Sequence, residues 1–341
     1  MNYIDCSDDI RSYHDDDVKL SEETRKKLRG HRNANRDRLK ENLKEKKKPA
    51  PLRFQKQGSY AMRTTIQHPA NDYDIDDGVV FAKADFKGER GAEMSALDAR
   101  KMVGKALEDD RFSKQPEVLK NCVRVYYNEG YYVDVPVYRE SGAEGAEVRE
   151  IASADWRESD PAAINDWFEK RVAARKSSDD DADTQLRRLV RLLKRYATSR
   201  ESWNLPSGFI LTILTDESYS YFDQREDRAF YNLIVAIRSR LRTNLVVRNP
   251  VQDEILTKED PDPKMVALRD RLGEAITTLE VLNDPKVTRR EALKAWAKVF
   301  NTDHFDDEIE GDDGDTEAMS VVVGASTPAA AVHKEGGGRF G

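Results

Sequence analysis

The sequence predicts an α+β protein, in which a small mixed sheet with helices is followed by a helical lobe. Residues 52–138 contain short runs with the two-residue alternation of strands, separated by turn-like and helical segments. From about residue 150, apolar residues recur every three or four positions, as in amphipathic helices. From Asp303 the chain is dominated by Asp, Glu, Gly and small residues, which cannot bury enough apolar surface to become ordered. We expect four parts: an N-terminal helical segment that packs on the core (1–48), the core (49–150), the helical lobe (151–302) and a disordered acidic and Gly-rich tail (303–341).

Composition limits the possible functions. The 341 residues carry a net charge of −7, which argues against strong binding to nucleic-acid duplexes. No apolar run approaches the roughly 18 residues that a membrane span needs. The first residues lack the basic and apolar stretches of a signal peptide, and two cysteines are too few for a disulfide framework. We therefore expect a cytoplasmic protein with no membrane partner.

The first long helix is expected from Ser21 to Lys48, with Ser21 as its N-cap. It is rich in Arg and Lys, and we interpret it as a solvated charged face, with a phosphate- or nucleic-acid-facing surface as the alternative. Residues 52–56 read as a strand that leads into Gly58 and Ser59. A Gly-Ser turn offers backbone N–H groups and a hydroxyl to a phosphate.

Three carboxylates follow at the spacing of a single strand face, at Asp72, Asp74 and Asp76. Such a row repels itself unless a cation binds it, and Mg²⁺ prefers oxygen ligands that it shares with substrate phosphates. The alternative is an acidic strand or turn that faces solvent.

A helix is expected over Ser95–Asp109, with Leu97, Val103, Ala106 and Leu107 as its apolar stripe. Two strands follow at 118–127 and 131–138, joined by a hairpin turn at 128–130. The second strand places Tyr131, Val133, Val135 and Val137 on one face and Asp134 on the other. An unpaired carboxylate is costly to bury in so apolar a run, which marks Asp134 as a functional residue.

The helical lobe is expected to contain a helix that starts at Asp160-Pro161, one over 183–199, one opened by residues 204–207, and further helices at roughly 226–242, 262–282 and 288–300. The helix over 183–199 places six apolar residues on one face and flanks them with basic residues, among them Lys194. Its apolar residues are Leu186, Leu189, Val190, Leu193, Tyr196 and Ala197.

Together, Gln57-Gly58-Ser59, Asp74-Ile75-Asp76-Asp77-Gly78 and Val133-Asp134-Val135-Pro136-Val137-Tyr138 resemble motifs of the bacterial cGAS/DncV-like nucleotidyltransferases. These are the CD-NTases of CBASS antiphage signalling, within the polymerase β-like superfamily. The resemblance covers roughly residues 50–300. It implies a nucleotidyltransferase core, a helical lobe and an active site in the cleft between them.

The resemblance also implies roles for residues. Asp74, Asp76 and Asp134 would be catalytic and would bind two Mg²⁺ ions, with Mn²⁺ as a possible substitute. The pair Asp72/Asp74 has the same spacing as Asp74/Asp76 and remains an alternative; we prefer the second, because residues 69–71 are turn-like. Nucleotide-binding residues would be Gly58 and Ser59 at the β- and γ-phosphates, with Lys194 and Ser207 clasping the triphosphate. Asp77 would point to the opposite face and be structural.

The function implied is the joining of ATP, together with GTP, into a cyclic di- or trinucleotide that activates an effector. Alternatives are a polymerase β-like transferase that tails RNA or nucleotidylates a protein or small molecule, and a non-enzymatic scaffold. A slim, mobile C-terminal glycine could enter the narrow active site of a conjugating enzyme. Some CD-NTases are conjugated in this way by an E1/E2-like enzyme, so we expect Gly341 to be the conjugation point, with a Gly-rich end of no function as the alternative.

Overall fold

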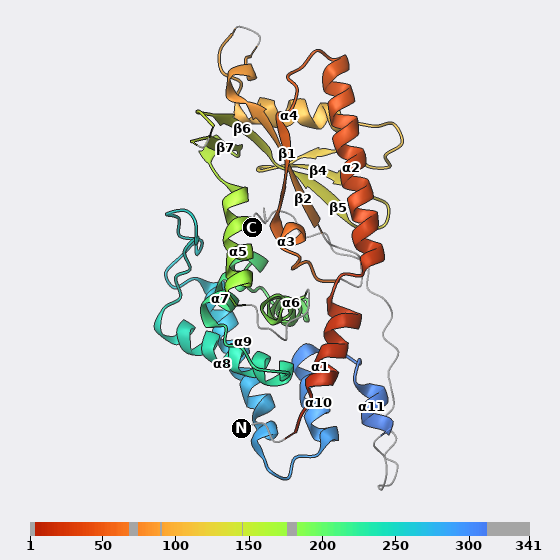
Figure 1. Ribbon diagram of the computed structural model, residues 1–341, viewed down its shortest axis with the longest axis vertical. Helices are drawn as coiled ribbons and strands as arrows, with labels where there is room; N and C mark the ends of the chain where they lie inside the picture. Colours follow the sequence, from red (N-terminus) through yellow and green to blue (C-terminus); the bar gives the residue numbers. More distant parts are fainter. Residues whose placement is uncertain (1–3, 68–73, 89–90, 145, 176–182, 312–341) are drawn as a thin grey trace. The chain divides into compact units, whose positions relative to one another are not determined.

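The computed structural model divides the chain into two compact units, which are shown in Figure 1 and described one at a time. The sheet unit comprises residues 19–174 and 250–252, and the helical unit comprises the described residues of 1–18, 175–249 and 253–311. The structure describes residues 4–67, 74–88, 91–144, 146–175 and 183–311. The expected α+β class is confirmed, with a mixed sheet in one unit and helices in the other.

Among the described residues, eight strands form one mixed sheet with β2 at its centre. The strand order is β3-β4-β5-β2-β6-β7-β8, and β1 also pairs with β2. Strand β1 runs antiparallel to β2, whereas β5 and β6 run parallel to it. The strands are β1 (Arg53–Gln57), β2 (Asp74–Ala82), β3 (Glu117–Val118), β4 (Val123–Tyr126), β5 (Tyr132–Val135), β6 (Val137–Ser141), β7 (Val148–Ala152) and β8 (Trp156–Glu158).

The strand expected over 131–138 is divided at Pro136 into β5 and β6, which pair with successive parts of β2. Proline has no N–H to donate to a sheet, but its carbonyl accepts the N–H of Val79 at 2.9 Å. The strand expected over 118–127 is likewise shorter, because residues 119–122 leave the sheet between β3 and β4.

Two helices, α2 (Glu22–Glu45) and α4 (Ala96–Leu107), contribute to the hydrophobic core on one face of this sheet. Their predicted N-caps, Ser21 and Ser95, each accept a backbone N–H at 3.1 Å. The predicted stripe of α4 was wrong at Leu97, which is 43% exposed. The small residues Ala96 and Ala99 are buried instead, because the helix lies close to the sheet.

The α2 helix is charged but not solvated all round, since Leu28, Leu39 and Leu43 belong to the core. The same unit also contains α3 (Gly58–Ala61), the 3₁₀-turn η2 (Lys83–Asp85) and α5 (Pro161–Ala174). Helix α5 starts where the sequence predicted and contacts β1, where Asn165 donates to the Lys56 carbonyl at 2.7 Å. It therefore lies with the sheet unit, although the expected boundary fell near residue 150.

The helical unit is built around α6 (Gln185–Thr198), which contacts η1, α7, α8 and α10. All six predicted apolar residues of α6 are buried. Four of its five basic residues are buried as well, and two of these pair with acidic residues of neighbouring segments: Arg188 with Glu226 at 2.9 Å, and Arg191 with Asp183. The unit's elements are α1 (Ser7–Tyr13), η1 (His14–Val18), α6, α7 (Gly208–Ser218), α8 (Glu226–Thr243), α9 (Pro263–Leu279), η3 (Glu280–Asn283), α10 (Arg289–Phe300) and α11 (Asp306–Gly311).

Residues 1–18 differ from the expectation, because the sequence showed no periodicity there and placed them with the core. They form α1 and the π-helical turn η1, and they belong to the helical unit. Ile10 and Tyr13 are fully buried, and the Tyr13 ring lies 4.9 Å from that of Phe300. Cys6, Ile10 and Tyr13 are buried at the i, i+4, i+7 spacing of a helix, a pattern that was overlooked among the acidic residues of this segment.

The disorder expected from Asp303 was wrong for the first residues of the tail. Phe305 is buried beside Tyr13, with ring centroids 5.6 Å apart, and His304 bonds to Asp17 at 2.8 Å. These contacts precede α11. The rest of the predicted tail, including Gly341, lies outside the described residues.

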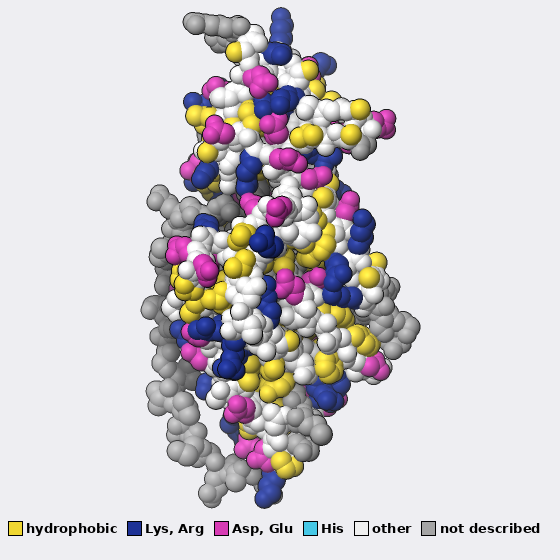
Figure 2. Space-filling view, turned by 90° about the vertical axis from the view of Figure 1, so that its left-hand side faces the viewer, with side chains coloured by type: hydrophobic (Ala, Val, Ile, Leu, Met, Phe, Trp, Pro, Cys, Tyr) yellow, Lys and Arg dark blue, Asp and Glu magenta, His cyan; other side chains and the backbone are white. Residues whose placement is uncertain are grey.

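Charges of both signs are interspersed on the face in Figure 2, with no continuous basic area among the coloured residues. Within the part of the chain that is described, no helix combines the length and the apolar character needed to cross a bilayer.

Candidate active site

Two predicted carboxylates lie side by side on the sheet. Asp76 of β2 and Asp134 of β5 are direct partners in the parallel pairing, so their side chains share one face. This face is opposite the α2 and α4 core, and each residue is only 5% exposed. Asp74 occupies the strand position two residues earlier, in register with Tyr132. Asp72 lies outside the described residues, so the alternative register remains open.

The predicted phosphate turn meets this pair through Gly58, which follows directly after β1. Gly58 has φ +67°, and a Cβ there would lie 2.1 Å from Oδ2 of Asp76. Only glycine allows this approach, because any side chain would occupy the place of the carboxylate. Ser59 follows in α3, with its Oγ 3.0 Å from Oγ1 of Thr65.

The donor atoms here fit a hard divalent cation. Carboxylate oxygens are the ligands that Mg²⁺ prefers, and two buried carboxylates on adjacent strands repel each other unless positive charge offsets them. Because Gly58 has no Cβ, the Asp76 carboxylate can lie directly against the Gly-Ser turn.

One residue of this site was missed from the sequence. Arg124 of β4 is the direct antiparallel partner of Asp134, and its Nε and Nη2 donate to the two carboxylate oxygens at 2.8 Å each. The alternation Val123-Arg124-Val125 could have placed Arg124 on the polar face. That Arg124 pairs with Asp134 can be seen only from the register between β4 and β5.

Asp77 points to the opposite face, as predicted. It is 3% exposed and accepts two hydrogen bonds from Arg36 of α2, at 2.6 and 2.5 Å. Burial raises the pKa of Asp77, and the bonds from Arg36 oppose that rise. This pair ties α2 to the central strand, so Asp77 has a structural role.

Lys194 and Ser207 lie together in the helical unit. A Cβ on Gly208 would lie 3.1 Å from Cε and 3.4 Å from Nζ of Lys194, so the ammonium group sits at the start of α7. Ser207 is the N-cap of that helix. Lys194 is only 7% exposed, so it is not a solvated surface charge. Positive charge and a helix N-terminus together favour an anion. That these residues face the carboxylates across a cleft stays a prediction.

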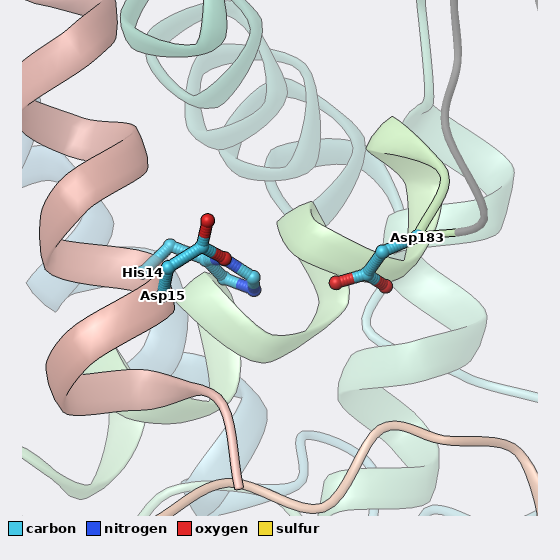
Figure 3. Close-up of side chains that lie close together, drawn as sticks. All are labelled: His14, Asp15 and Asp183. Carbon is cyan, nitrogen blue, oxygen red and sulfur yellow. The ribbon is translucent and has the colours of Figure 1, made fainter. Parts of the chain in front are cut away.

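A second cluster, His14, Asp15 and Asp183, has atoms close enough together for a metal ion. Figure 3 shows His14 and Asp15 on one helical segment, with Asp183 approaching from the start of α6. Arg191, however, donates its Nε to Nε2 of His14 at 2.9 Å and also pairs with Asp183. The imidazole lone pair is thereby taken, which disfavours a metal centre.

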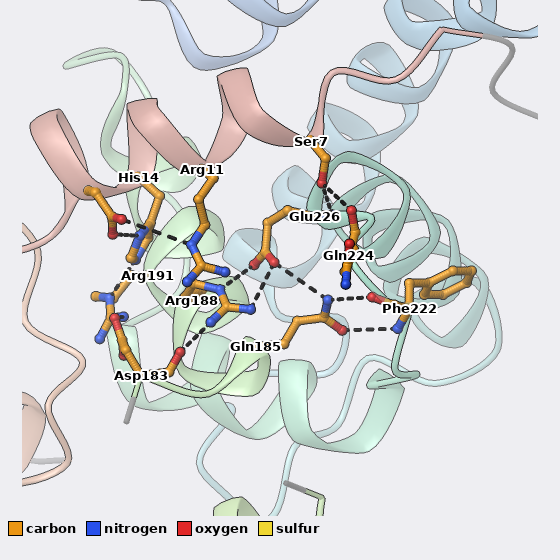
Figure 4. A network of polar contacts seen from close by, with 11 residues as sticks. Ser7, Arg11, His14, Asp183, Gln185, Arg188, Arg191, Phe222, Gln224 and Glu226 are labelled. Carbon is orange, nitrogen blue, oxygen red and sulfur yellow. Dashed lines mark hydrogen bonds and ion pairs between the residues drawn. The ribbon is translucent and has the colours of Figure 1, made fainter. Parts of the chain in front are cut away.

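The cluster belongs to a larger polar network that joins α1, η1, α6 and α8 (Figure 4). His14 bonds to Asp15 at 2.7 Å, and Ser7 accepts the backbone N–H of Glu226 at 2.6 Å. Burial lowers the pKa of His14, with a further lowering from the charge of Arg191. The network therefore holds a neutral histidine among buried ion pairs, and we assign it a structural role.

Part of the chain is similar in sequence to known proteins. Residues 52–138 match the sequence model of the nucleotidyltransferase domain of DncV-like cyclic GMP-AMP synthases. A cyclic GMP-AMP synthase of Escherichia albertii is 27% identical over 250 residues, which cover 69% of this chain and 53% of that protein. The chain thus spans about half the length of this curated relative.

Solved structures share the fold. Vibrio cholerae DncV with the linear intermediate 5′ pppA(3′,5′)pG has a TM-score of 0.69 at 16% identity, covering 88% of this chain and 96% of that one. Bradyrhizobium diazoefficiens CdnG with GTP has a TM-score of 0.66 at 16% identity, covering 88% and 98%. Escherichia coli CdnC with ATP has a TM-score of 0.64 at 18% identity, with the same coverages.

Proposed function

We propose that the chain, whose residues 52–138 match the DncV-like nucleotidyltransferase domain, joins nucleoside triphosphates into a cyclic oligonucleotide. The observation that carries this proposal is the buried pair of Asp76 and Asp134, aligned on neighbouring strands beside Gly58. ATP and GTP are the proposed substrates, because the similar proteins were solved with these nucleotides or with a product of their joining.

In the proposed reaction, the 3′-hydroxyl of one nucleotide attacks the α-phosphorus of another. A new P–O bond forms, the bond to the β-phosphate breaks, the hydroxyl proton is lost and pyrophosphate leaves. Repetition within one linear product closes the ring. Two divalent cations held by Asp74, Asp76 and Asp134, Mg²⁺ or Mn²⁺, would lower the pKa of the hydroxyl and neutralise the leaving pyrophosphate.

The chain's own groups would bind and orient the triphosphate. The Gly58-Ser59 turn, whose glycine lies against Asp76, would offer backbone N–H groups and the Ser59 hydroxyl to phosphate oxygens. In the helical unit, the Lys194 ammonium and the N-terminus of α7 at Ser207 offer positive charge to phosphate oxygens. These groups position the reacting phosphorus, which is the main task of a protein in such transfers.

The test uses the purified chain with labelled ATP and GTP, Mg²⁺ or Mn²⁺, and then phosphatase. We expect a small labelled product that resists phosphatase, and none from Asp134→Asn. Label on RNA, on protein or on a small acceptor would instead support a tailing or modifying transferase. No transfer of label under any condition would support a scaffold.

We further propose that the cytoplasmic product activates a separate effector, and that Gly341 is conjugated by an E1/E2-like enzyme. The support is the sequence alone, a C-terminal glycine after a Gly-rich stretch. Co-expression with such an enzyme should give an adduct through the Gly341 carboxylate, seen by mass spectrometry. Deleting Gly341 should remove the adduct and leave basal synthesis unchanged; an adduct that survives the deletion would contradict the proposal.

A further inference from the structure

A row of polar side chains crosses four strands of the sheet at one level. Arg124 of β4 is paired with Asp134 of β5, Asp134 with Asp76 of β2, and Asp76 with Gln57 of β1. Directly paired residues of neighbouring strands share a face, so all four lie on the face with the proposed metal ligands. Arg124 brings the one positive charge of this row, next to two carboxylates.

The arginine is held from two sides. Its Nε and Nη2 donate to Oδ1 and Oδ2 of Asp134, both at 2.8 Å, in a two-pronged contact. Its guanidinium also lies over the Tyr132 ring, 3.6 Å from the ring centre. The guanidinium is planar, and both contacts fix that plane. The Asp134 carboxylate is therefore fixed in turn, because both of its oxygens are engaged.

This arrangement leaves room for a cation. A carboxylate has about four lone-pair positions, two on each oxygen, and a two-pronged arginine uses one on each. Asp134 can thus accept from Arg124 on one side while it ligates a metal ion with a remaining lone pair. Ligating carboxylates are commonly held by a second hydrogen-bonded group, and loss of that group weakens the metal site.

We propose that Arg124 is the positioning residue for the third carboxylate: it holds Asp134 in the orientation that binds a divalent cation, without touching the cation or the nucleotide. The inference rests on the proposed function, since that function gives Asp134 its metal. It differs from a role in stability alone, which would leave metal affinity unchanged. It also differs from competition, in which the guanidinium would occupy the place of the metal and its removal would tighten binding.

The sheet contains a matched control. Arg139 of β6 is the direct antiparallel partner of Glu150 in β7 and donates to its two oxygens at 2.8 and 2.9 Å. It also lies over an aromatic ring, that of Trp156, at 4.4 Å. The two arginines thus share a two-pronged carboxylate contact and a ring contact, but Glu150 is no proposed metal ligand; Arg139 also pairs with Glu93 at 3.1 Å.

The experiment measures the affinity of the nucleotide-free, full-length protein for Mn²⁺ alone, from the free Mn²⁺ signal in electron paramagnetic resonance. We expect Arg124→Ala to weaken Mn²⁺ binding about 10-fold or more. Arg139→Ala should leave the affinity at the wild-type value, although both variants lose a partly buried ion pair. In an Asp134→Asn background, the further change Arg124→Ala should have no effect on Mn²⁺ binding.

Unchanged or tighter Mn²⁺ binding in Arg124→Ala would overturn the proposal. If that variant does not fold, Arg124→Lys replaces it, because lysine keeps the charge but not the two-pronged geometry. The lysine variant should bind Mn²⁺ more weakly than wild type, and wild-type affinity would again overturn the proposal. If the purified protein shows no nucleotidyl transfer but its Mn²⁺ binding depends on Arg124, only the proposed function is refuted. Transfer with Mn²⁺ binding independent of Arg124 would refute this inference alone.

Discussion

Gly58→Ala is the substitution whose effect on the site can be calculated most directly from the structure. The added Cβ would lie 2.1 Å from Oδ2 of Asp76, whereas ordinary contacts begin at 3.4 Å. The carboxylate or the turn must therefore move by about 1 Å, and a misplacement of about 1 Å can cost on the order of 100-fold in rate. The positive φ of +67° adds about 1–2 kcal/mol of backbone strain for alanine.

The assay follows pyrophosphate release at saturating ATP and GTP, together with the urea midpoint of unfolding. Gly91→Ala is the matched control, because Gly91 has φ +77° and a Cβ there would meet none of the described atoms within 4 Å. Alanine at this position has the same backbone strain without the clash. We expect about a 100-fold loss of rate for Gly58→Ala and a near-normal rate for Gly91→Ala. A Gly58→Ala enzyme within about threefold of wild type would refute the reasoning.

Three further predictions concern the ligands, the lysine and the buried histidine. The double change Asp74→Asn and Asp76→Asn should abolish product formation. It should not lower the urea midpoint of the metal-free protein, because it removes like charges that repel each other. If Asp72→Asn were inactive and Asp76→Asn active, the site would instead lie two residues earlier. Lys194→Ala should raise the KM for triphosphate more than it lowers kcat, since a phosphate clamp binds substrate and transition state alike, and an unchanged KM would refute the role. Burial lowers the pKa of His14 below its ordinary value of 6.5. Above pH 6.5 the histidine is neutral in both the folded and the unfolded chain. As the pH falls from 6.5 toward the folded-state pKa, the unfolded chain binds a proton that the folded chain excludes, so stability is progressively lost. Wild type should therefore lose more stability between pH 7.5 and 5 than His14→Gln, as measured by urea unfolding, and equal losses would contradict the prediction.

Local patterns were sufficient for much of the sheet unit. A lone carboxylate in an apolar strand marked Asp134, because burying it without a partner would be costly. The pairing of Asp134 with Asp76 depends on the parallel register of β5 and β2, which was seen only in the structure. Arg124 was not predicted, because its contact depends on the register between β4 and β5, which no local pattern reveals.

Where the predictions failed, small or polar residues make packing contacts that were expected from large apolar residues. Helix α4 lies so close to the sheet that a Cβ on Gly104 would be 3.0 Å from a methyl group of Val118. Alanines, rather than Leu97, therefore face the core. In residues 1–18, the segment is held through His14 and Arg191 and through aromatic contacts of Tyr13. Hydrophobic periodicity does not detect the polar contacts, although Cys6, Ile10 and Tyr13 do recur at helical spacing.

The central claim is that the chain closes a ring of nucleotides at Asp76 and Asp134. Its most direct test is the mass of the product made by the purified protein from ATP and GTP with Mg²⁺. The account predicts a mass equal to that of the joined nucleoside monophosphates less one water for each, with no terminal phosphate, and no such species from Asp134→Asn. A product that keeps a terminal triphosphate, or the same cyclic mass from the Asp134→Asn protein, would contradict it.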